Sequence, residues 1–165
     1  MPARLATICF VMMFLVGISS PAVRADDSAA SRATLQGITA VAVVVESLDD
    51  DAKKIGLTEE AIRTDVELKL RLAGMRIVTQ DDLLTLPGAP YLYVSVTVLP
   101  PEAGCISVEL NQSAVLRRNG ESAFGVTTWS VGSVRVNPSA QGIRNAIKDE
   151  VDTFLNAWLS VNPKK

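Results

Sequence analysis

Residues able to perform acid–base or nucleophilic chemistry are few in this chain of 165 residues. The sequence contains no histidine, which is a common general base and a common metal ligand in proteins. A serine or cysteine nucleophile would therefore need a lysine or a carboxylate as its base. The lysines in predicted helices, Lys69 and Lys148, are expected on the surface, and no Ser-x-x-Lys pattern follows residue 25. The sequence favours a protein without enzymatic activity, and a histidine-free hydrolase is kept as an alternative.

Two runs of aspartate, at residues 49–51 and 81–82, are the candidates for a hard cation such as Ca²⁺, which takes several carboxylate oxygens. The longer run lacks the glycine and the distal glutamate of an EF-hand loop. We therefore interpret it as a solvated loop and the shorter run as a helix cap. The glycines occur singly, without the glycine-rich loop of a phosphate site. Neither a metal nor another cofactor is expected.

Three aromatic residues form the candidate binding surface. Tyr91 and Tyr93 share one face of a strand that strict alternation predicts over residues 91–99, and Trp129 lies in the return strand of the neighbouring hairpin. Tyrosine and tryptophan are enriched where proteins bind one another. The three side chains are therefore expected to form a partner-binding surface. The alternative is that they cover the second face of the sheet or pack under the N-terminal segment.

The N-terminus has the order of a secretory signal peptide. Arg4 precedes an apolar run over residues 5–18, Ser19 to Pro21 interrupt the run, and Ala25 offers a small residue for cleavage. The run is about 14 residues long, whereas a membrane-spanning helix needs about 20. We expect residues 1–25 to be removed near Ala25 and the chain to be secreted or periplasmic, without a membrane span. An uncleaved N-terminal anchor is the alternative.

Cys105 is the cysteine that remains after this cleavage, because Cys9 belongs to the predicted signal peptide. A single cysteine cannot form an internal disulfide. Since Cys105 begins an apolar strand pattern, a buried or half-buried side chain is expected. A free thiol and a bridge to another chain are the alternatives.

Hydropathy patterns after residue 25 predict an α+β fold. Residues 26–36 lack periodicity and are expected to form a flexible tail, and residues 37–162 are expected to form a single domain. The element order β-α-β-(short α)-β-β-β-α predicts a mixed sheet of about five strands with two main helices on one face. The expected strands cover residues 38–45, 75–78, 91–99, 106–116 and 124–136, and a polar loop covers 46–55.

Local signals mark the helix ends and one turn. Thr58 is a predicted N-cap and Gly74 a predicted left-handed stop for the first main helix. Asn119-Gly120 predicts a type I′ turn, in which both central residues have positive φ. Helical spacing predicts a buried stripe on each main helix: Ile62, Val66, Leu70 and Ala73 on the first, and Ile143, Ile147, Val151, Phe154, Leu155 and Trp158 on the last.

Residues 70–75 (Leu-Arg-Leu-Ala-Gly-Met), the Tyr91-Leu92-Tyr93-Val94 strand and the Thr128-Trp129 strand resemble a small secreted bacterial family of unknown function. The element order over about residues 37–162 is also similar to the N-terminal domain of the Tol-system periplasmic propeller protein. It is similar as well to the lipoproteins that gate curli secretion or activate penicillin-binding proteins. The resemblance implies a periplasmic, non-enzymatic adaptor, and it transfers no functional residue. This chain lacks the anchoring cysteine of those lipoproteins.

The sequence therefore predicts an interaction module that contacts envelope proteins through an edge of its sheet, since an edge strand can accept a strand of another chain. Without residues 1–25 the chain keeps 14 of its 16 basic residues against 18 acidic ones, and this negative balance argues against a nucleic-acid partner. A binder of a small apolar or lipidic ligand, held between helices and sheet, is an alternative function.

Overall fold

The computed structural model of the chain describes residues 27–99 and 103–163. The predicted signal peptide and its cleavage point near Ala25 lie outside these ranges. The described residues form a mixed sheet of five strands in the order β2-β1-β3-β4-β5. The strands are β1 (Ala40–Val45), β2 (Arg76–Ile77), β3 (Tyr91–Leu99), β4 (Ala103–Val115) and β5 (Ser122–Val136).

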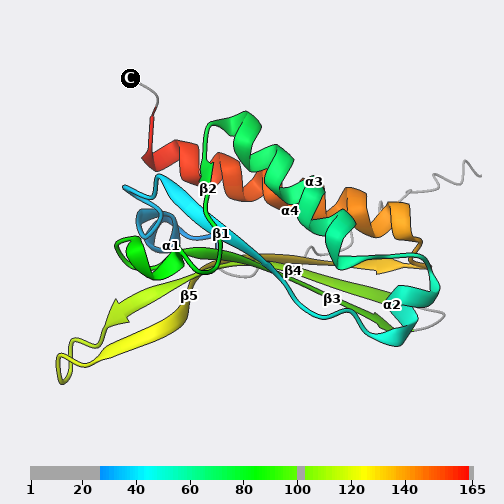
Figure 1. Cartoon of the computed structure of the whole chain (residues 1–165), viewed down its shortest axis with the longest axis horizontal. Helices are drawn as coiled ribbons and strands as arrows, with labels where there is room; N and C mark the ends of the chain where they lie inside the picture. The colour runs from blue at the N-terminus through cyan, green and yellow to red at the C-terminus, as the bar shows by residue number, and fades with distance from the viewer. Residues whose placement is uncertain (1–26, 100–102, 164–165) are drawn as a thin grey trace, which may run out of the picture.

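Two long helices cover one face of this sheet, side by side (Figure 1). They are α3 (Glu59–Ala73) and α4 (Ala140–Val161), and the shorter elements are α1 (Ala29–Ala33), α2 (Asp50–Lys54) and the 3₁₀ turn η1 (Leu83–Thr85). This arrangement confirms the predicted α+β class. At the other end of the molecule from α2, the β4–β5 hairpin extends beyond the helices (Figure 1).

Strand pairing follows the element order. β1 runs parallel to both β2 and β3, and β3, β4 and β5 form an antiparallel meander. Because side chains alternate between the two faces of a strand, β3 points Leu92 and Val94 to the helices and Tyr91 and Tyr93 away from them. The sheet therefore has one face in the core and one face open.

The predicted apolar stripes of the two main helices form the core. Ile62, Val66 and Leu70 of α3 are fully buried, and so are most of the stripe residues of α4. The ring of Phe154 on α4 meets the ring of Trp129 on β5 edge to face, with centroids 5.3 Å apart. Thr58 caps α3 by accepting a hydrogen bond from the Ala61 amide, and Gly74 ends this helix with φ 93°. Both predicted end signals are confirmed.

The segment expected to be a flexible tail contains α1. Ser28 accepts a hydrogen bond from the Ser31 amide as the N-cap, and Leu35 is fully buried. Asn162, just after α4, accepts a hydrogen bond from the Gly37 amide and donates one to the Leu35 carbonyl. A five-residue helix is too short to show a helical period in the sequence, so its attachment to the core depends on these long-range contacts.

Two local predictions are wrong. The expected loop over residues 46–55 contains α2, because the Asp49 carboxylate accepts a hydrogen bond from the Ala52 amide and starts a helix there. Of the two expected central residues, Asn119 and Gly120, only Gly120 has positive φ, 75°, and both of their amides donate to the Leu116 carbonyl. The connection is therefore a longer loop that ends in a left-handed glycine, in place of the two-residue type I′ turn.

Replacing the core ring of α4 tests this packing. Phe154→Ala should lower the free energy of unfolding by about 3–5 kcal/mol, because it removes buried surface and leaves a cavity beside Trp129. Urea unfolding followed by circular dichroism measures the change. Leu72→Ala, at a side chain of α3 that is 76% exposed, is the control and should change the free energy little. Equal effects of the two substitutions would contradict the observed core.

An ion pair between the two main helices makes a pH-dependent contribution to the stability of the fold. Arg144 of α4 donates two hydrogen bonds, of 2.8 and 2.9 Å, to the Asp65 carboxylate of α3. These hydrogen bonds, and then the charge of Arg144, lower the pKa of Asp65. A lowered pKa in the folded state stabilises the fold above the ordinary carboxyl range, about pH 4, and this stabilisation is lost as the pH falls through the folded-state pKa.

Asp65→Asn should therefore lower the free energy of unfolding by about 1 kcal/mol at pH 7, and by progressively less as the pH falls below 4. Chemical unfolding of both proteins between pH 7 and pH 2.5 measures the difference. Glu121→Gln on the exposed β4–β5 loop is the control. A difference that stays constant over this pH range would show that the ion pair does not act through ionisation of Asp65.

Candidate functional site

The open face of the sheet carries a row of polar side chains across β4 and β5. The Glu109 carboxylate accepts hydrogen bonds from the Ser107 hydroxyl at 2.9 Å and the Thr127 hydroxyl at 3.2 Å. Thr127 also lies 2.6 Å from the side-chain oxygen of Asn111. On β3, burial together with a hydrogen bond to Glu46 raises the pKa of Tyr93. The contacts of Thr127 join β5 to β4, and the two hydroxyl groups partly satisfy the hydrogen-bonding capacity of the Glu109 carboxylate.

The predicted surface of three aromatic residues is not formed. Tyr91 and Tyr93 lie on the open face and are half-buried, and the Tyr91 ring lies 6.5 Å from the ring of Phe124. Trp129 is fully buried on the opposite face, because its partner in the strand register is Leu110. Trp129 shares the helix side with Val131, because β5 pairs regularly with β4 from Trp129 to Val136. The register shift between Leu110 and Asn111 places Thr127 on the open face, although it lies only two residues from Trp129, and hydropathy alternation alone could not locate this shift.

The buried position expected for Cys105 is also wrong, since the side chain is exposed and the thiol is free. Cys105 lies between Thr97 of β3 and Val134 of β5 in the strand register, and both of these neighbours are exposed on the open face. The apolar residues around Cys105 in the sequence belong to the alternate positions of β4, which face the helices.

The aspartate runs take structural roles. Besides capping α2, Asp49 accepts a hydrogen bond from the Val98 amide of β3 at 2.9 Å. The hydrogen bonds from Ala52 and Val98 lower the pKa of Asp49. Asp82 precedes η1 without a side-chain cap and instead accepts a hydrogen bond from the Thr79 hydroxyl. Within residues 27–99 and 103–163, no group of three or more cysteine or acidic side chains is placed to hold a metal ion.

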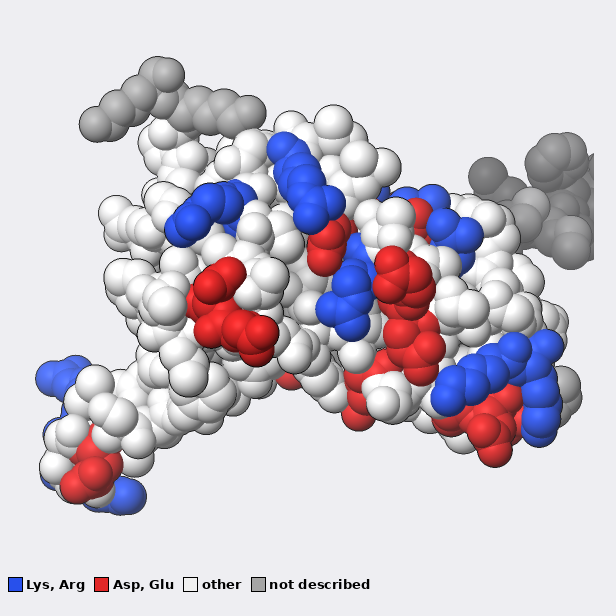
Figure 2. All heavy atoms as spheres, in the orientation of Figure 1, with Lys and Arg blue, Asp and Glu red and all other residues white. Residues whose placement is uncertain are grey.

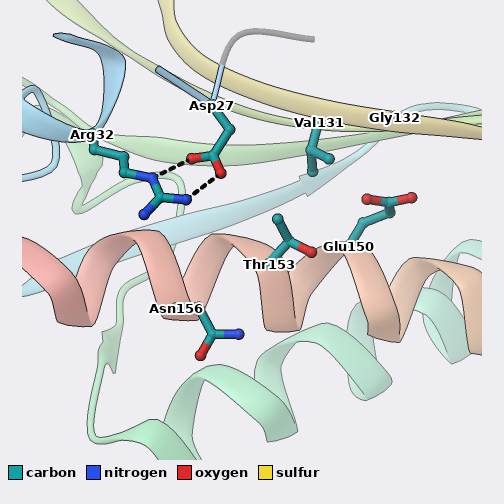
Figure 3. Close-up of a pocket in the computed structure, with 7 residues that line it drawn as sticks. All are labelled: Asp27, Arg32, Val131, Gly132, Glu150, Thr153 and Asn156. Carbon is teal, nitrogen blue, oxygen red and sulfur yellow. Dashed lines mark hydrogen bonds and ion pairs between the residues drawn. The ribbon is translucent and has the colours of Figure 1, made fainter. Parts of the chain in front are cut away.

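A hollow of about 350 Å³ lies between α4, β5 and the start of the described chain (Figure 3). Glu150 and Thr153 point from α4 toward β5, and the Asp27–Arg32 pair lies across the hollow from α4 (Figure 3). The lining residues are Asp27, Arg32, Val131, Gly132, Glu150, Thr153 and Asn156. Glu150 is only 7% exposed, which makes it the most buried acidic residue of the described chain.

The walls of the hollow are held by charged hydrogen bonds. Arg32 donates to both carboxylate oxygens of Asp27, at 2.8 and 2.5 Å, and these contacts raise the pKa of Arg32. The indole Nε1 of Trp129 donates to the same carboxylate at 2.9 Å. Asp27 therefore connects α1 to the core tryptophan, and its charge is neutralised by Arg32.

The sequence analysis missed Glu150, although the sequence carries a signal for it. Glu150 follows Ile147 by three residues and precedes Phe154 by four, so it occupies a position of the apolar stripe of α4. A carboxylate at such a position is seldom buried without a partner.

Two further hollows lie elsewhere on the surface. One is lined by residues 36–40, 86–87, Pro90 and Gln112, and the other includes Arg63, Glu67 and Arg71 of α3. Polar side chains contribute to all three of these hollows and charged side chains to two of them, which differs from the internal cavity lined by valine and leucine expected of a lipid binder. Charged side chains of both signs are interspersed over the face shown in Figure 2. The helices described include none with the length and apolar character that crossing a membrane requires.

No protein-family model and no curated protein matches the chain. Among solved structures, the chain is similar to a PelC dodecamer from Paraburkholderia phytofirmans, with 15% identity, a TM-score of 0.42 and coverage of 74% of this chain and 87% of that chain. A second dodecamer of the same PelC, which carries a leucine-to-methionine substitution, matches with 16% identity and a TM-score of 0.43, covering 82% of this chain and 94% of that chain. A likeness this distant carries no argument about function, and the resemblance to Tol-system and curli proteins stays a prediction.

Proposed function

We propose that the chain is a non-enzymatic interaction module of the bacterial cell envelope, which binds a partner protein by accepting one of its strands along β5. The predicted signal peptide would bring the chain to the periplasm or the outside. The fold would then present β5 to the partner, with α3 and α4 forming the supporting layer.

The observation that carries the proposal is the length and openness of β5. This strand has 15 residues and lies at the edge of the sheet, where β4 is the one strand that pairs with it among the described residues. Half of the backbone donors and acceptors of an edge strand point away from its neighbour. Near the middle of β5, the Thr34 hydroxyl lies 3.4 Å from the Thr128 carbonyl, so the segment after α1 covers this point.

The composition of β5 supports the same conclusion. Proteins usually protect an edge strand with lysine, proline or inward-pointing charges. Along Ser122–Val136 the single charged residue is Arg135 and there is no proline. Val134 and Val136, whose side chains are 52% and 77% exposed, lie on the regularly paired half of the strand. A strand added along β5 would cover part of both.

Site-specific crosslinking tests this proposal in cells. A photoreactive amino acid at Val134 should crosslink the exported chain to a second protein, and the same group at Leu72 on α3 should not. Adding Val136→Lys should reduce the yield at Val134 at least about tenfold, because a lysine on an edge strand disfavours pairing with another strand. The matched control adds Leu68→Lys on α3, which places a new lysine on the opposite side of the molecule. Equal crosslinking at Val134 and Leu72 would contradict binding through β5.

Export is tested separately. The chain recovered from a periplasmic or secreted fraction should begin at Asp26, because cleavage is predicted after Ala25. Mass spectrometry of the intact protein measures its N-terminus. A chain that keeps Met1 and stays in the cytosol would contradict the envelope location.

A further inference from the structure

We propose that the hollow between α4 and β5 receives a lysine side chain from the strand that pairs with β5. The inference rests on the proposed function and deepens it, because it names the chemistry by which the partner is selected. When a strand is added to a sheet edge, backbone hydrogen bonds provide affinity, and pockets for alternate side chains provide specificity.

The first step is the unbalanced charge of Glu150. Glu150 is 7% exposed and lines the hollow, and no residue in the described ranges donates a hydrogen bond to its carboxylate or forms an ion pair with it. The oxygens of this carboxylate are not among the fully buried unpaired atoms of the described chain, so they can be reached from the hollow, where a cation is bound more strongly than at a fully exposed carboxylate. A cation brought by a ligand would supply the missing partner.

The neighbouring basic residues are engaged elsewhere. Arg32, across the hollow, directs its guanidinium to both carboxylate oxygens of Asp27 and leaves no net charge on that wall. Arg135 at the end of β5 faces Asp149, with a nitrogen–oxygen distance of 4.0 Å. Of the acidic and basic groups that line the hollow, the carboxylate of Glu150 is therefore the one left without a counter-charge in the described chain.

The second step is the position of the hollow beside β5, the edge strand of the sheet. Val131 and Gly132 of β5 line it, so a strand paired with this part of β5 would pass along the hollow. Successive side chains of that strand would point to opposite faces, and those on the helix side would be directed toward α4. The next residue of β5, Ser133, has a hydroxyl that is buried without a hydrogen-bond partner in the described chain. A second unsatisfied polar group therefore lies next to the hollow along β5.

The third step is the choice of lysine. An ammonium group is compact and has three donors on a flexible stem, whereas a guanidinium needs acceptors in one plane. Besides the carboxylate of Glu150, the hollow offers the Thr153 hydroxyl oxygen as an acceptor, because its proton is donated to the Asp149 carbonyl at 3.1 Å. A metal ion would need more carboxylates than the described residues bring together.

Binding of n-butylammonium, the analogue of a lysine side chain, tests the hollow directly. The two tryptophans give separate indole N–H signals in NMR spectra, and Trp129 reports on the hollow through its hydrogen bond to Asp27. Trp158, which donates to the Ile38 carbonyl, is the internal control. In the exported chain, millimolar n-butylammonium should shift the Trp129 signal to saturation, and n-butanol should not. Glu150→Gln should weaken the binding at least about tenfold.

Thr153→Val provides a second variant if Glu150→Gln does not fold, and it should weaken n-butylammonium binding about two- to tenfold through loss of one acceptor. Equal binding by wild type and Glu150→Gln, or an equal response to n-butanol, would overturn the assignment. Tighter binding of n-butylguanidinium than of n-butylammonium would overturn the choice of lysine.

The crosslinking assay separates this inference from the proposed function. Glu150→Gln should reduce the crosslink at Val134 at least about tenfold if the partner's lysine enters the hollow. An unchanged yield with Glu150→Gln, together with loss of the crosslink on adding Val136→Lys, would leave binding through β5 intact and overturn the lysine assignment. Binding of n-butylammonium without any crosslink at Val134 would overturn the strand partner and, with it, this inference.

Discussion

The burial of α4 against β4 and β5 is the constraint on which the rest of the structure depends. The stripe from Ile143 to Trp158 needs a large apolar surface, and the helix-facing side chains of the meander provide it. Trp129 is drawn into this contact and packs against Phe154. Because both main helices lie on the same face, the opposite face of the sheet has no comparable cover from the described elements, and β5 remains at an edge.

The same contact explains why the hollow has an unusual chemistry. The apolar stripe of α4 packs against the sheet, so a side chain at any position of this stripe points toward the sheet. Glu150 occupies one of these positions, where an apolar side chain would be expected. Its oxygens are not among the fully buried unpaired atoms of the described chain, so the carboxylate opens into the hollow. The short segment before β1 closes the other side of the hollow through Asp27 and Arg32, which links the N-terminal segment to the core by a hydrogen bond to Trp129.

Local patterns predicted most of the fold. The helices follow from a period of three to four residues between Ile62 and Leu70 and between Ile143 and Trp158, and the ends of α3 follow from Thr58 and Gly74. These signals are reliable because capping and amphipathic burial act over one or two helical turns. The prediction was less successful at α1 and α2, because five-residue helices carry little periodicity.

The sequence by itself determined the α+β class, the order of the five strands and two main helices, and the two buried helix faces, because each depends on residues close together in the chain. The tertiary structure alone decided the side of the sheet on which each residue of β5 lies. Regular pairing of β5 with β4 from Trp129 to Val136 places Trp129 on the helix side together with Val131, and Cys105 lies on the other side. Pairing between distant strands sets this register, and a displacement by one residue would exchange the two faces. The hollow around Glu150 is likewise created by the meeting of α1, β5 and α4, which no local pattern describes.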